Sequence, residues 1–163
     1  MTLTLILMRH AKSDWGSLGL SDHDRPLNSR GARDAPMMGE WLRKKGHLPD
    51  QILCSTATRT RQTLEGLGID APTTFLAALY HANPATMQDA LQQAQGRKVL
   101  MIGHNPGIAA FADDMLQHAP DHPRFFDYPT CATLVAEFDL EKWADLRPAT
   151  GRAVDFVIPA DLA

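Results

Sequence analysis

Two histidines and two arginines in this chain have side chains suited to handling a phosphoryl group. Arg9 and His10 are adjacent, whereas Arg59 and His104 follow much later in the sequence. A neutral imidazole can attack phosphorus when its proton is held on the other ring nitrogen. Guanidinium groups bind phosphoryl oxygens through forked hydrogen bonds and spread the charge of the transition state. A second histidine can donate to the same oxygens, so these four residues suit phosphoryl transfer if the fold brings them together.

Each of these residues follows a short apolar run that predicts a β-strand. Arg9 and His10 follow the first run, the Ser55–Arg59 segment follows the second, and the Gly103–Pro106 segment follows the third. In open α/β sheets, ligands bind beyond the carboxyl ends of the strands, so we expect the three segments to converge. The runs are bounded by polar or turn residues, and we predict five strands: Leu3–Met8, Gln51–Cys54, Lys98–Ile102, Thr133–Phe138 and Val154–Ile158.

Helical patterns lie between most of these strands. Asn28 is a predicted N-cap, Thr58 to Leu67 has an apolar side, and the pairs Asn83-Pro84 and Asn105-Pro106 each predict a cap followed by Pro at the first helical position. Alternating strands and helices predict an α/β fold. We expect one domain over residues 1–163, a three-layer sandwich with a mostly parallel central sheet and helices on both faces. The last two strands lack an intervening helix, which leaves room for an antiparallel part.

The length, charge and cysteine content of the chain argue against several classes of function. The chain has 163 residues, a net charge of −3 and a pI of about 6.1, which argues against general binding to nucleic acid or to anionic membranes. Cys54 and Cys131 are the only cysteines, and neither belongs to a zinc-type spacing, so we expect free thiols in a reducing compartment. The first apolar run is too short for a signal peptide or a membrane span. The expected location is therefore the cytoplasm.

Four sequence blocks, in order, resemble the histidine phosphatase superfamily, which is also called phosphoglycerate mutase-like. Residues 7–11 (Leu-Met-Arg-His-Ala) are similar to its Arg-His-Gly signature, with Ala11 in place of Gly. Residues 24–31 resemble its Arg-x-Leu-Thr-x-x-Gly segment, and residues 55–63 its Ser-Pro-x-x-Arg-Ala-x-Gln-Thr block. Residues 103–106 (Gly-His-Asn-Pro) match the second-histidine motif. The short chain length and the Arg-Pro-Leu sequence resemble the SixA-type branch of small phosphohistidine phosphatases.

The resemblance implies specific roles and a substrate class. His10 would be the nucleophile, with Arg9, Arg59 and His104 forming the phosphate pocket, and neither a metal ion nor a cofactor would be needed. The implied substrate is phosphohistidine on a signalling or phosphocarrier protein. The alternatives are a phosphatase for small phosphate esters and a non-catalytic phosphoprotein-binding module on the same fold. The sequence leaves the oligomeric state open.

The chain departs from the wider family in one segment. Mutases and many small-molecule phosphatases carry a Glu proton donor between the second and third strands, but residues 75–82 (Phe-Leu-Ala-Ala-Leu-Tyr-His-Ala) contain no carboxylate. A reaction that needs a general acid, including the mutase reaction, is therefore not expected. The leaving group should instead be one that departs readily.

Three further residues are assigned to substrate binding, with alternatives left open. Arg25 either lies near the pocket or pairs with Asp22 or Asp24. His81 either points into the pocket or only flanks the Asn83 cap, and Asn105 follows the second histidine directly. Two rival patterns fail on detail: Cys54 and Arg59 are one residue too close for a cysteine phosphatase loop, and Asn105 stands where a nucleophile elbow has Ser.

Overall fold

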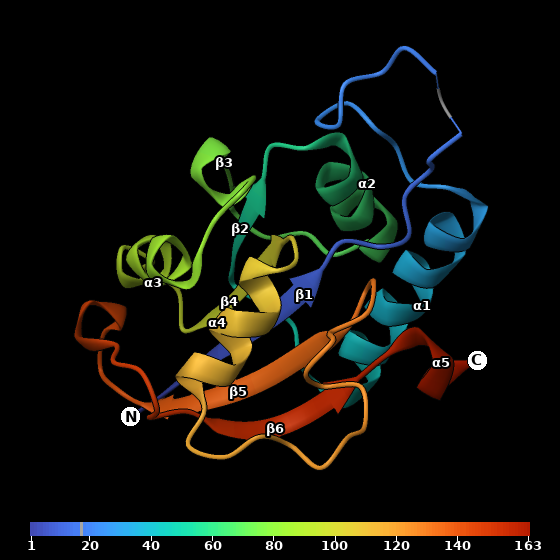
Figure 1. Cartoon of the computed structure of the whole chain (residues 1–163). Coiled ribbons are helices and arrows are strands. Elements are labelled where there is room, and N and C mark those ends of the chain that lie inside the picture. The colour runs from blue at the N-terminus through green and yellow to red at the C-terminus, as the bar shows by residue number, and fades with distance from the viewer. Residues whose placement is uncertain (17) are drawn as a thin grey trace.

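A six-stranded sheet forms the centre of the computed structural model, which describes residues 1–16 and 18–163. The spatial order of the strands is β3-β2-β4-β1-β5-β6 (Figure 1). The five predicted strands are all present, each within two residues of its expected bounds, and one further strand, β3, was not predicted. The strands are β1 (Thr2–Arg9), β2 (Gln51–Ser55), β3 (Thr73–Leu76), β4 (Lys98–Gly103), β5 (Thr133–Asp139) and β6 (Arg152–Val157).

The sheet has a parallel and an antiparallel half. Strands β3, β2, β4 and β1 pair in parallel, while β5 pairs antiparallel with both β1 and β6. In the parallel register Ile102 of β4 pairs with Met8 of β1 and with Cys54 of β2. The residues that follow these three positions therefore emerge at one edge of the sheet. The predicted mostly parallel α/β sheet is confirmed, and its antiparallel part lies where the intervening helix is missing.

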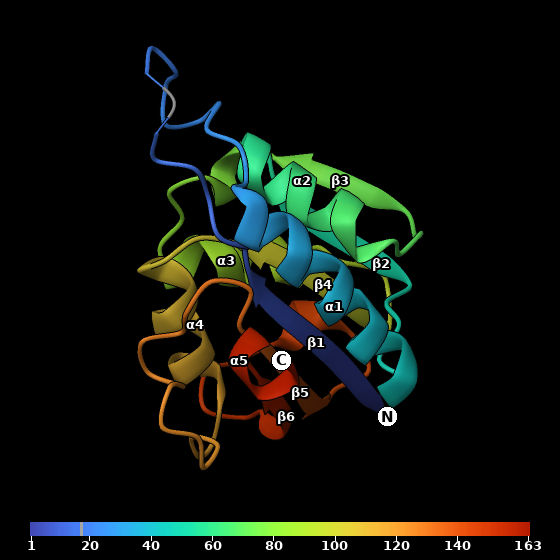
Figure 2. The same cartoon turned by 90° about the vertical axis from the view of Figure 1, so that its right-hand side faces the viewer.

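Helices cover both faces of this sheet (Figures 1 and 2). Because side chains alternate along a strand, Leu5 and Leu7 pack with α3 and α4, whereas Ile6 and Met8 pack with α1 and α2. The sheet and the helices packed on each of its faces through these two apolar clusters form the three layers that the sequence predicted. The helices are α1 (Ser29–Lys45), α2 (Thr58–Leu67), α3 (Pro84–Gln92), α4 (Gly107–Met115) and α5 (Pro159–Leu162), with short 3-10 turns η1 (Ala77–Leu79) and η2 (Trp143–Asp145).

The predicted helix caps at Asn28 and Asn83 are present. The side chain of Asn28 accepts a hydrogen bond from the Gly31 amide, and that of Asn83 accepts one from the Thr86 amide, both at 2.9 Å. The prediction at Asn105-Pro106 differs by one residue, because Pro106 is the N-cap and the helix begins at Gly107. A Cβ atom at position 107 would collide with the Ala82 carbonyl oxygen. This close approach sets the start of α4 against the loop that precedes α3.

Strand β3 was missed because it lies at the sheet edge and is largely exposed. Three of its four residues, Thr73, Thr74 and Phe75, are exposed, so the segment lacks the continuous apolar run that marks a buried strand. Among the helices of the described residues, none is both long and apolar enough to cross a bilayer.

Candidate active site

His10 lies directly after β1, and its backbone is fixed from both sides. Its amide donates to the Gly103 carbonyl at 3.1 Å, and its carbonyl accepts from the Cys131 amide at 2.9 Å. The ring atom Nδ1 lies 2.7 Å from the Ala11 carbonyl oxygen. Because a carbonyl oxygen can only accept, Nδ1 carries the proton and Nε2 keeps its lone pair. The hydrogen bond therefore selects the tautomer that a nucleophilic imidazole requires.

The charge state of His10 also suits attack. The side chain is 6% exposed, and this burial holds the pKa of His10 well below its usual value. His104, Arg9 and Arg59 lower the pKa further, against the opposing effect of the Ala11 hydrogen bond. His10 is therefore neutral at pH 7.

His104 follows β4, and its ring centroid lies 5.2 Å from that of His10. Its Nε2 is 2.8 Å from the Ser55 hydroxyl, which also accepts from the Ala57 amide at 3.3 Å. We assign the Ser55 hydroxyl as the donor to Nε2, which places the proton of His104 on Nδ1. Burial, and then the charge of Arg59, lower the pKa of His104 to about 3. With this assignment His104 is a neutral ring whose Nδ1–H can donate.

Arg59 lies in the first turn of α2 and is held by one edge of its guanidinium. Its Nη1 donates to the Asp22 carbonyl at 2.7 Å, and its Nη2 donates to the Asp22 carboxylate at 3.1 Å. This end-on fork leaves the other edge, which includes Nε, for a different partner. Arg9, at the end of β1, donates from Nη1 to the Tyr128 carbonyl at 3.2 Å and likewise keeps its Nε free of a protein partner in the described residues.

The site therefore contains several buried donors without a partner among residues 1–16 and 18–163. They are Nε of Arg9, Nε of Arg59 and Nδ1 of His104. Leaving a buried N–H unpaired costs about 1–3 kcal/mol, and more for a charged group. Three such groups on residues close to His10 make a site that favours an oxyanion such as a phosphoryl group. The structure thus brings His10, Arg9, Arg59 and His104 together as the sequence predicted, and their catalytic roles remain a prediction.

Asp22 connects Arg25 to this group. Its carboxylate accepts from Nη2 of Arg25 at 2.9 Å, from Arg59, and from the Tyr80 hydroxyl. The hydrogen bonds from Tyr80 and Arg25 hold the pKa of Asp22 well below its usual value, so it is charged and cannot act as a proton donor. Arg25 also donates to the Ser13 hydroxyl. The two alternatives for Arg25 are therefore compatible, because its partner Asp22 is itself bonded to Arg59.

His81 lies at the outer side of the site. Its ring stacks near Tyr80, with centroids 3.9 Å apart, and the residue is exposed. Together with His104 and Asn105 it lines a cavity of about 300 Å³. His81 therefore lies beside the site, and its role in substrate binding stays a prediction.

Asn105 uses its side chain to hold the backbone. Nδ2 donates to the Asp127 and Tyr128 carbonyls at 3.0 and 3.1 Å, and Oδ1 accepts from the Ala109 amide at 3.2 Å. The Ile108 amide is also occupied, by the His104 carbonyl. The Ile108 and Ala109 amides at the start of α4 are therefore already used within the protein and are not available to an anion. Substrate contact by Asn105 stays a prediction.

Tyr80 and Ser55 contact the site but were not assigned to it from the sequence, and Asp22 was considered only as a possible partner of Arg25. Ser55 stood within a recognised block, directly after a predicted strand, and that position was the available signal. Asp22 and Tyr80 meet only through a hydrogen bond between side chains of two different loops. No local pattern in the sequence predicts such a pair.

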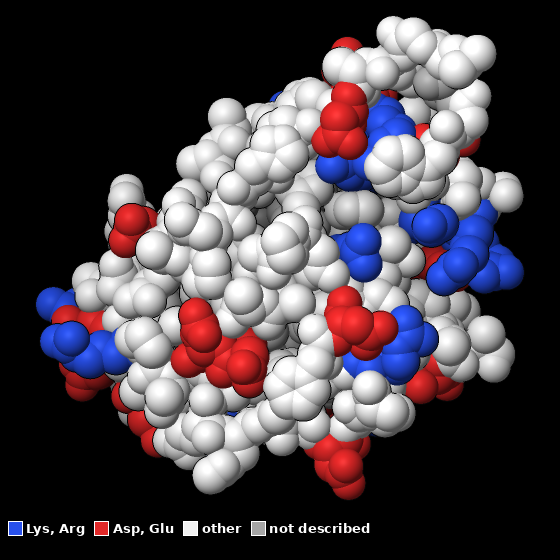
Figure 3. All heavy atoms as spheres, viewed as in Figure 1, with Lys and Arg blue, Asp and Glu red and all other residues white. Residues whose placement is uncertain are grey.

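The surface around the site is unevenly charged. Figure 3 shows basic side chains gathered on the side of α1, while the area over β3 and α3 is mostly uncharged. Arg30 and Arg33 contribute to this basic side, and both contact the buried carboxylate of Asp34. A net charge of −3 therefore coexists with a locally basic side of the molecule at α1.

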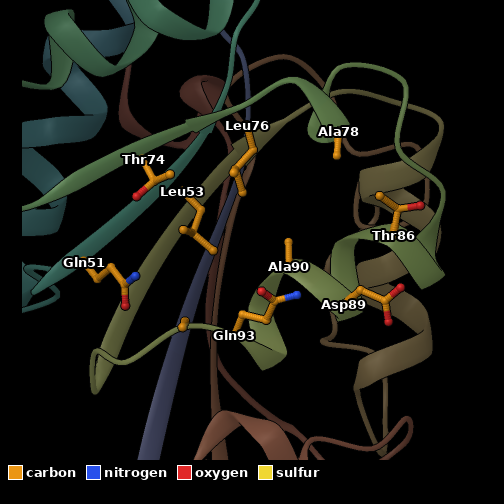
Figure 4. A pocket seen from close by; sticks show the side chains of 10 residues that line it. Gln51, Leu53, Thr74, Leu76, Ala78, Thr86, Asp89, Ala90 and Gln93 are labelled. Carbon is orange, nitrogen blue, oxygen red and sulfur yellow. The ribbon is translucent and has the colours of Figure 1, made fainter.

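The rival sites receive no support from the geometry. Cys54 is fully buried, and burial raises the pKa of its thiol to about 12, which makes it a poor nucleophile. A further cavity of about 440 Å³ between β2, β3 and α3 is lined by residues such as Leu53, Leu76 and Gln93, and contains none of the motif residues (Figure 4). Within the described residues, no group of three or more His, Cys, Asp or Glu side chains could hold a metal ion.

Comparisons with known proteins agree with this geometry. The family model described as "Histidine phosphatase superfamily (branch 1)" matches residues 5–84. An uncharacterized protein of Mycobacterium tuberculosis is 37% identical over 159 residues, covering 93% of this chain and 99% of that protein. A phosphohistidine phosphatase SixA candidate from Nakamurella multipartitia has a similar structure, with a TM-score of 0.83 and 33% identity over 98% of this chain and 97% of its own. A corresponding candidate from Agrobacterium tumefaciens gives a TM-score of 0.78 and 26% identity, covering 96% and 99% of the two chains.

Proposed function

Because this chain belongs to the histidine phosphatase superfamily, we propose that it hydrolyses phosphohistidine on a signalling or phosphocarrier protein, through a phosphorylated His10. The observation that carries the proposal is the hydrogen bond from Nδ1 of His10 to the Ala11 carbonyl, which leaves Nε2 as a lone pair in a buried site rich in donors. The names of the similar structures from Nakamurella multipartitia and Agrobacterium tumefaciens support the substrate class.

In the first step, Nε2 of His10 attacks phosphorus and a new P–N bond forms. The bond between phosphorus and the substrate ring breaks, and the ring, which carries a proton on its other nitrogen, leaves as neutral imidazole. Arg9, Arg59 and the Nδ1–H of His104 donate to the phosphoryl oxygens and stabilise the charge that spreads over them. The Ala11 carbonyl stabilises the positive charge that develops on the His10 ring, as the partner of its Nδ1–H.

In the second step, water attacks the phosphoryl group on His10. The P–N bond breaks, inorganic phosphate leaves, and His10 regains its neutral form. The overall reaction consumes one water and one phosphohistidine and yields histidine and phosphate.

The absence of a suitable acid favours phosphohistidine over alkyl phosphates. Asp22 is charged, because Tyr80 and Arg25 hold its pKa down, and residues 75–82 contain no carboxylate. A positioned acid typically contributes about 10²–10⁴-fold to the rate when the leaving group is poor. An imidazole has a reference pKa of about 6.5 and departs without such help. This preference separates the proposed function from the alternative, a phosphatase for small alkyl phosphate esters.

The test compares substrates at equal concentration. We expect kcat/KM for a histidine-phosphorylated phosphocarrier protein to exceed that for sugar phosphates by about 10² or more, the lower end of the contribution of a general acid. Faster hydrolysis of sugar phosphates would favour the small-ester alternative. Binding without turnover would favour a non-catalytic phosphoprotein-binding module.

A further inference from the structure

The segment between β1 and α1 stands away from the rest of the molecule in both ribbon views (Figures 1 and 2). We refer to residues 13–16 and 18–27 of this segment as the arm. Three large apolar side chains on the arm are exposed: Trp15 at 74%, Leu18 at 98% and Leu20 at 49%. Single exposed apolar residues are ordinary on a protein surface, but a group on a projecting loop marks an interaction site.

The arm is bonded to one residue of the candidate pocket, Arg59. The Trp15 ring stacks on the Arg25 guanidinium, whose carbon lies 3.6 Å from the ring centroid. Arg25 donates to Asp22, and Asp22 accepts from Arg59. The arm therefore adjoins the candidate pocket through Asp22, while its two exposed leucines lie on the same arm and outside the pocket. A folded protein that brings its phosphoryl group to His10 would come close to the arm.

We propose that Trp15, Leu18 and Leu20 form a docking surface for an apolar patch that lies beside the phosphohistidine of a folded protein substrate. The proposal rests on the proposed function, and it adds that this enzyme recognises the protein and not only the phosphorylated side chain. A free phosphohistidine is too small to fill the pocket and cover the arm at the same time. The docking surface should therefore act on the protein substrate alone.

The charge of the arm favours a protein over a lipid surface. The arm contains three aspartates and one basic residue, Arg25, which is paired with Asp22. Segments that insert into anionic membranes combine apolar residues with basic ones, because anionic lipids attract Lys and Arg. An arm with a net negative charge would be repelled by such a surface.

The experiment uses two substrates with the same scissile P–N bond. One is a phosphocarrier protein phosphorylated on histidine with phosphoramidate, and the other is the free phosphohistidine amino acid. The variant is Leu18→Asp combined with Leu20→Asp, which leaves every residue of the pocket unchanged. The control is Leu48→Asp, because Leu48 is 47% exposed and lies before β2, at the opposite end of the parallel strands.

We expect the double variant to lose about tenfold or more in kcat/KM on the phosphorylated protein, as the removal of two buried leucine contacts implies. Its kcat/KM on free phosphohistidine should equal that of the wild type, and the Leu48→Asp control should match the wild type on both substrates. An equal loss on both substrates, or no loss on either, would overturn the docking surface while leaving the proposed function in place.

Two other outcomes separate the remaining alternatives. A wild-type enzyme inactive on both phosphohistidine substrates would overturn the proposed function and the docking surface together. Sedimentation of the wild type and the double variant tests self-association. If the wild type is a dimer that the double variant dissociates, the arm is covered by a second copy of this chain, and the proposal of a substrate-docking surface is wrong.

Discussion

The floor and the rim of the candidate site are built in different ways. The floor consists of Arg9, His10, Arg59 and His104. Arg9 ends β1, the two histidines directly follow β1 and β4, and Arg59 lies in the first turn of α2; both histidines are about 5% exposed. The rim consists of Asp22, Arg25, Tyr80 and His81, which lie on loops, and the side chain of Asp22 is 45% exposed.

The two regions also differ in what fixes their side chains. On the floor, backbone carbonyls and the Ser55 hydroxyl decide which ring nitrogen of His10 and of His104 carries a proton. On the rim, charged side chains hold one another, with Asp22 at the centre. If the proposed function is right, the sheet edge supplies the chemistry, and the loops position Arg59 and contact the substrate. Perturbing the floor should therefore affect the rate far more than perturbing the rim.

The largest effect is expected from His10→Ala. Removing the nucleophile eliminates the covalent route, so kcat/KM on nitrophenyl phosphate should fall by at least about 10⁴-fold. The matched control is His118→Ala, since His118 is an exposed histidine near the end of α4. Thermal melting of both variants should follow the wild type. Turnover near the wild-type rate in His10→Ala would remove His10 from the mechanism.

The next effect concerns the leaving group. Since Asp22 is charged and residues 75–82 contain no carboxylate, kcat/KM should drop steeply as the leaving-group pKa rises across a series of aryl and alkyl phosphates, by about 10²–10⁴-fold in total. Measuring the slope against leaving-group pKa checks this expectation. A flat dependence would show that a proton donor is present. His81 would then be the first residue to replace, and His81→Ala should slow only the poor leaving groups.

A smaller loss is expected on the rim, from Asp22→Asn. The substitution weakens the charged hydrogen bonds that hold one edge of Arg59, so kcat should fall about tenfold. Tyr80→Phe removes one neutral donor to the same carboxylate and should cost roughly threefold. Steady-state kinetics and inhibition by vanadate measure both effects. Tighter vanadate binding in Asp22→Asn would instead mean that Asp22 competes with the phosphoryl group for Arg59.

The smallest expected effect on kcat/KM is that of lowering the pH from 7 to 6. Burial lowers the pKa of His10 well below its usual 6.5, so the proton that would block its lone pair binds only at lower pH. The acid limb of kcat/KM, corrected for ionisation of the substrate, should therefore lie below pH 6.5. Between pH 7 and pH 6 the loss should be less than about twofold. An acid limb centred at or above pH 6.5 would show that His10 is not desolvated in the free enzyme.

Residues of the floor could be predicted from the sequence more readily than residues of the rim. His10 and His104 follow buried strands whose parallel register aligns their carboxyl ends, so apolar runs alone place them at one edge. Asp22 was expected only as a possible partner of Arg25, and its contacts with Arg59 and Tyr80 were not predicted, because they depend on how two loops meet in space. Strand β3 was missed for a related reason, because an exposed edge strand lacks the apolar pattern from which a strand is predicted.

The arm shows the same limit. Its apolar residues are visible in the sequence, but whether Trp15 and Leu18 are core or surface depends on the path of the chain between β1 and α1. Only the structure shows that they are exposed and that Trp15 lies on Arg25.

The most direct test of the account is to trap the phosphorylated enzyme. Wild-type protein and His10→Ala are mixed with phosphohistidine substrate in the presence of EDTA, quenched in alkali, and mapped by tandem mass spectrometry. We predict a phosphoryl group on His10 of the wild type that is stable in base and lost in acid, as a phosphoramidate should be, with none on the variant. A phosphoryl group on another residue, or turnover without any phosphorylated enzyme, would contradict the central claim.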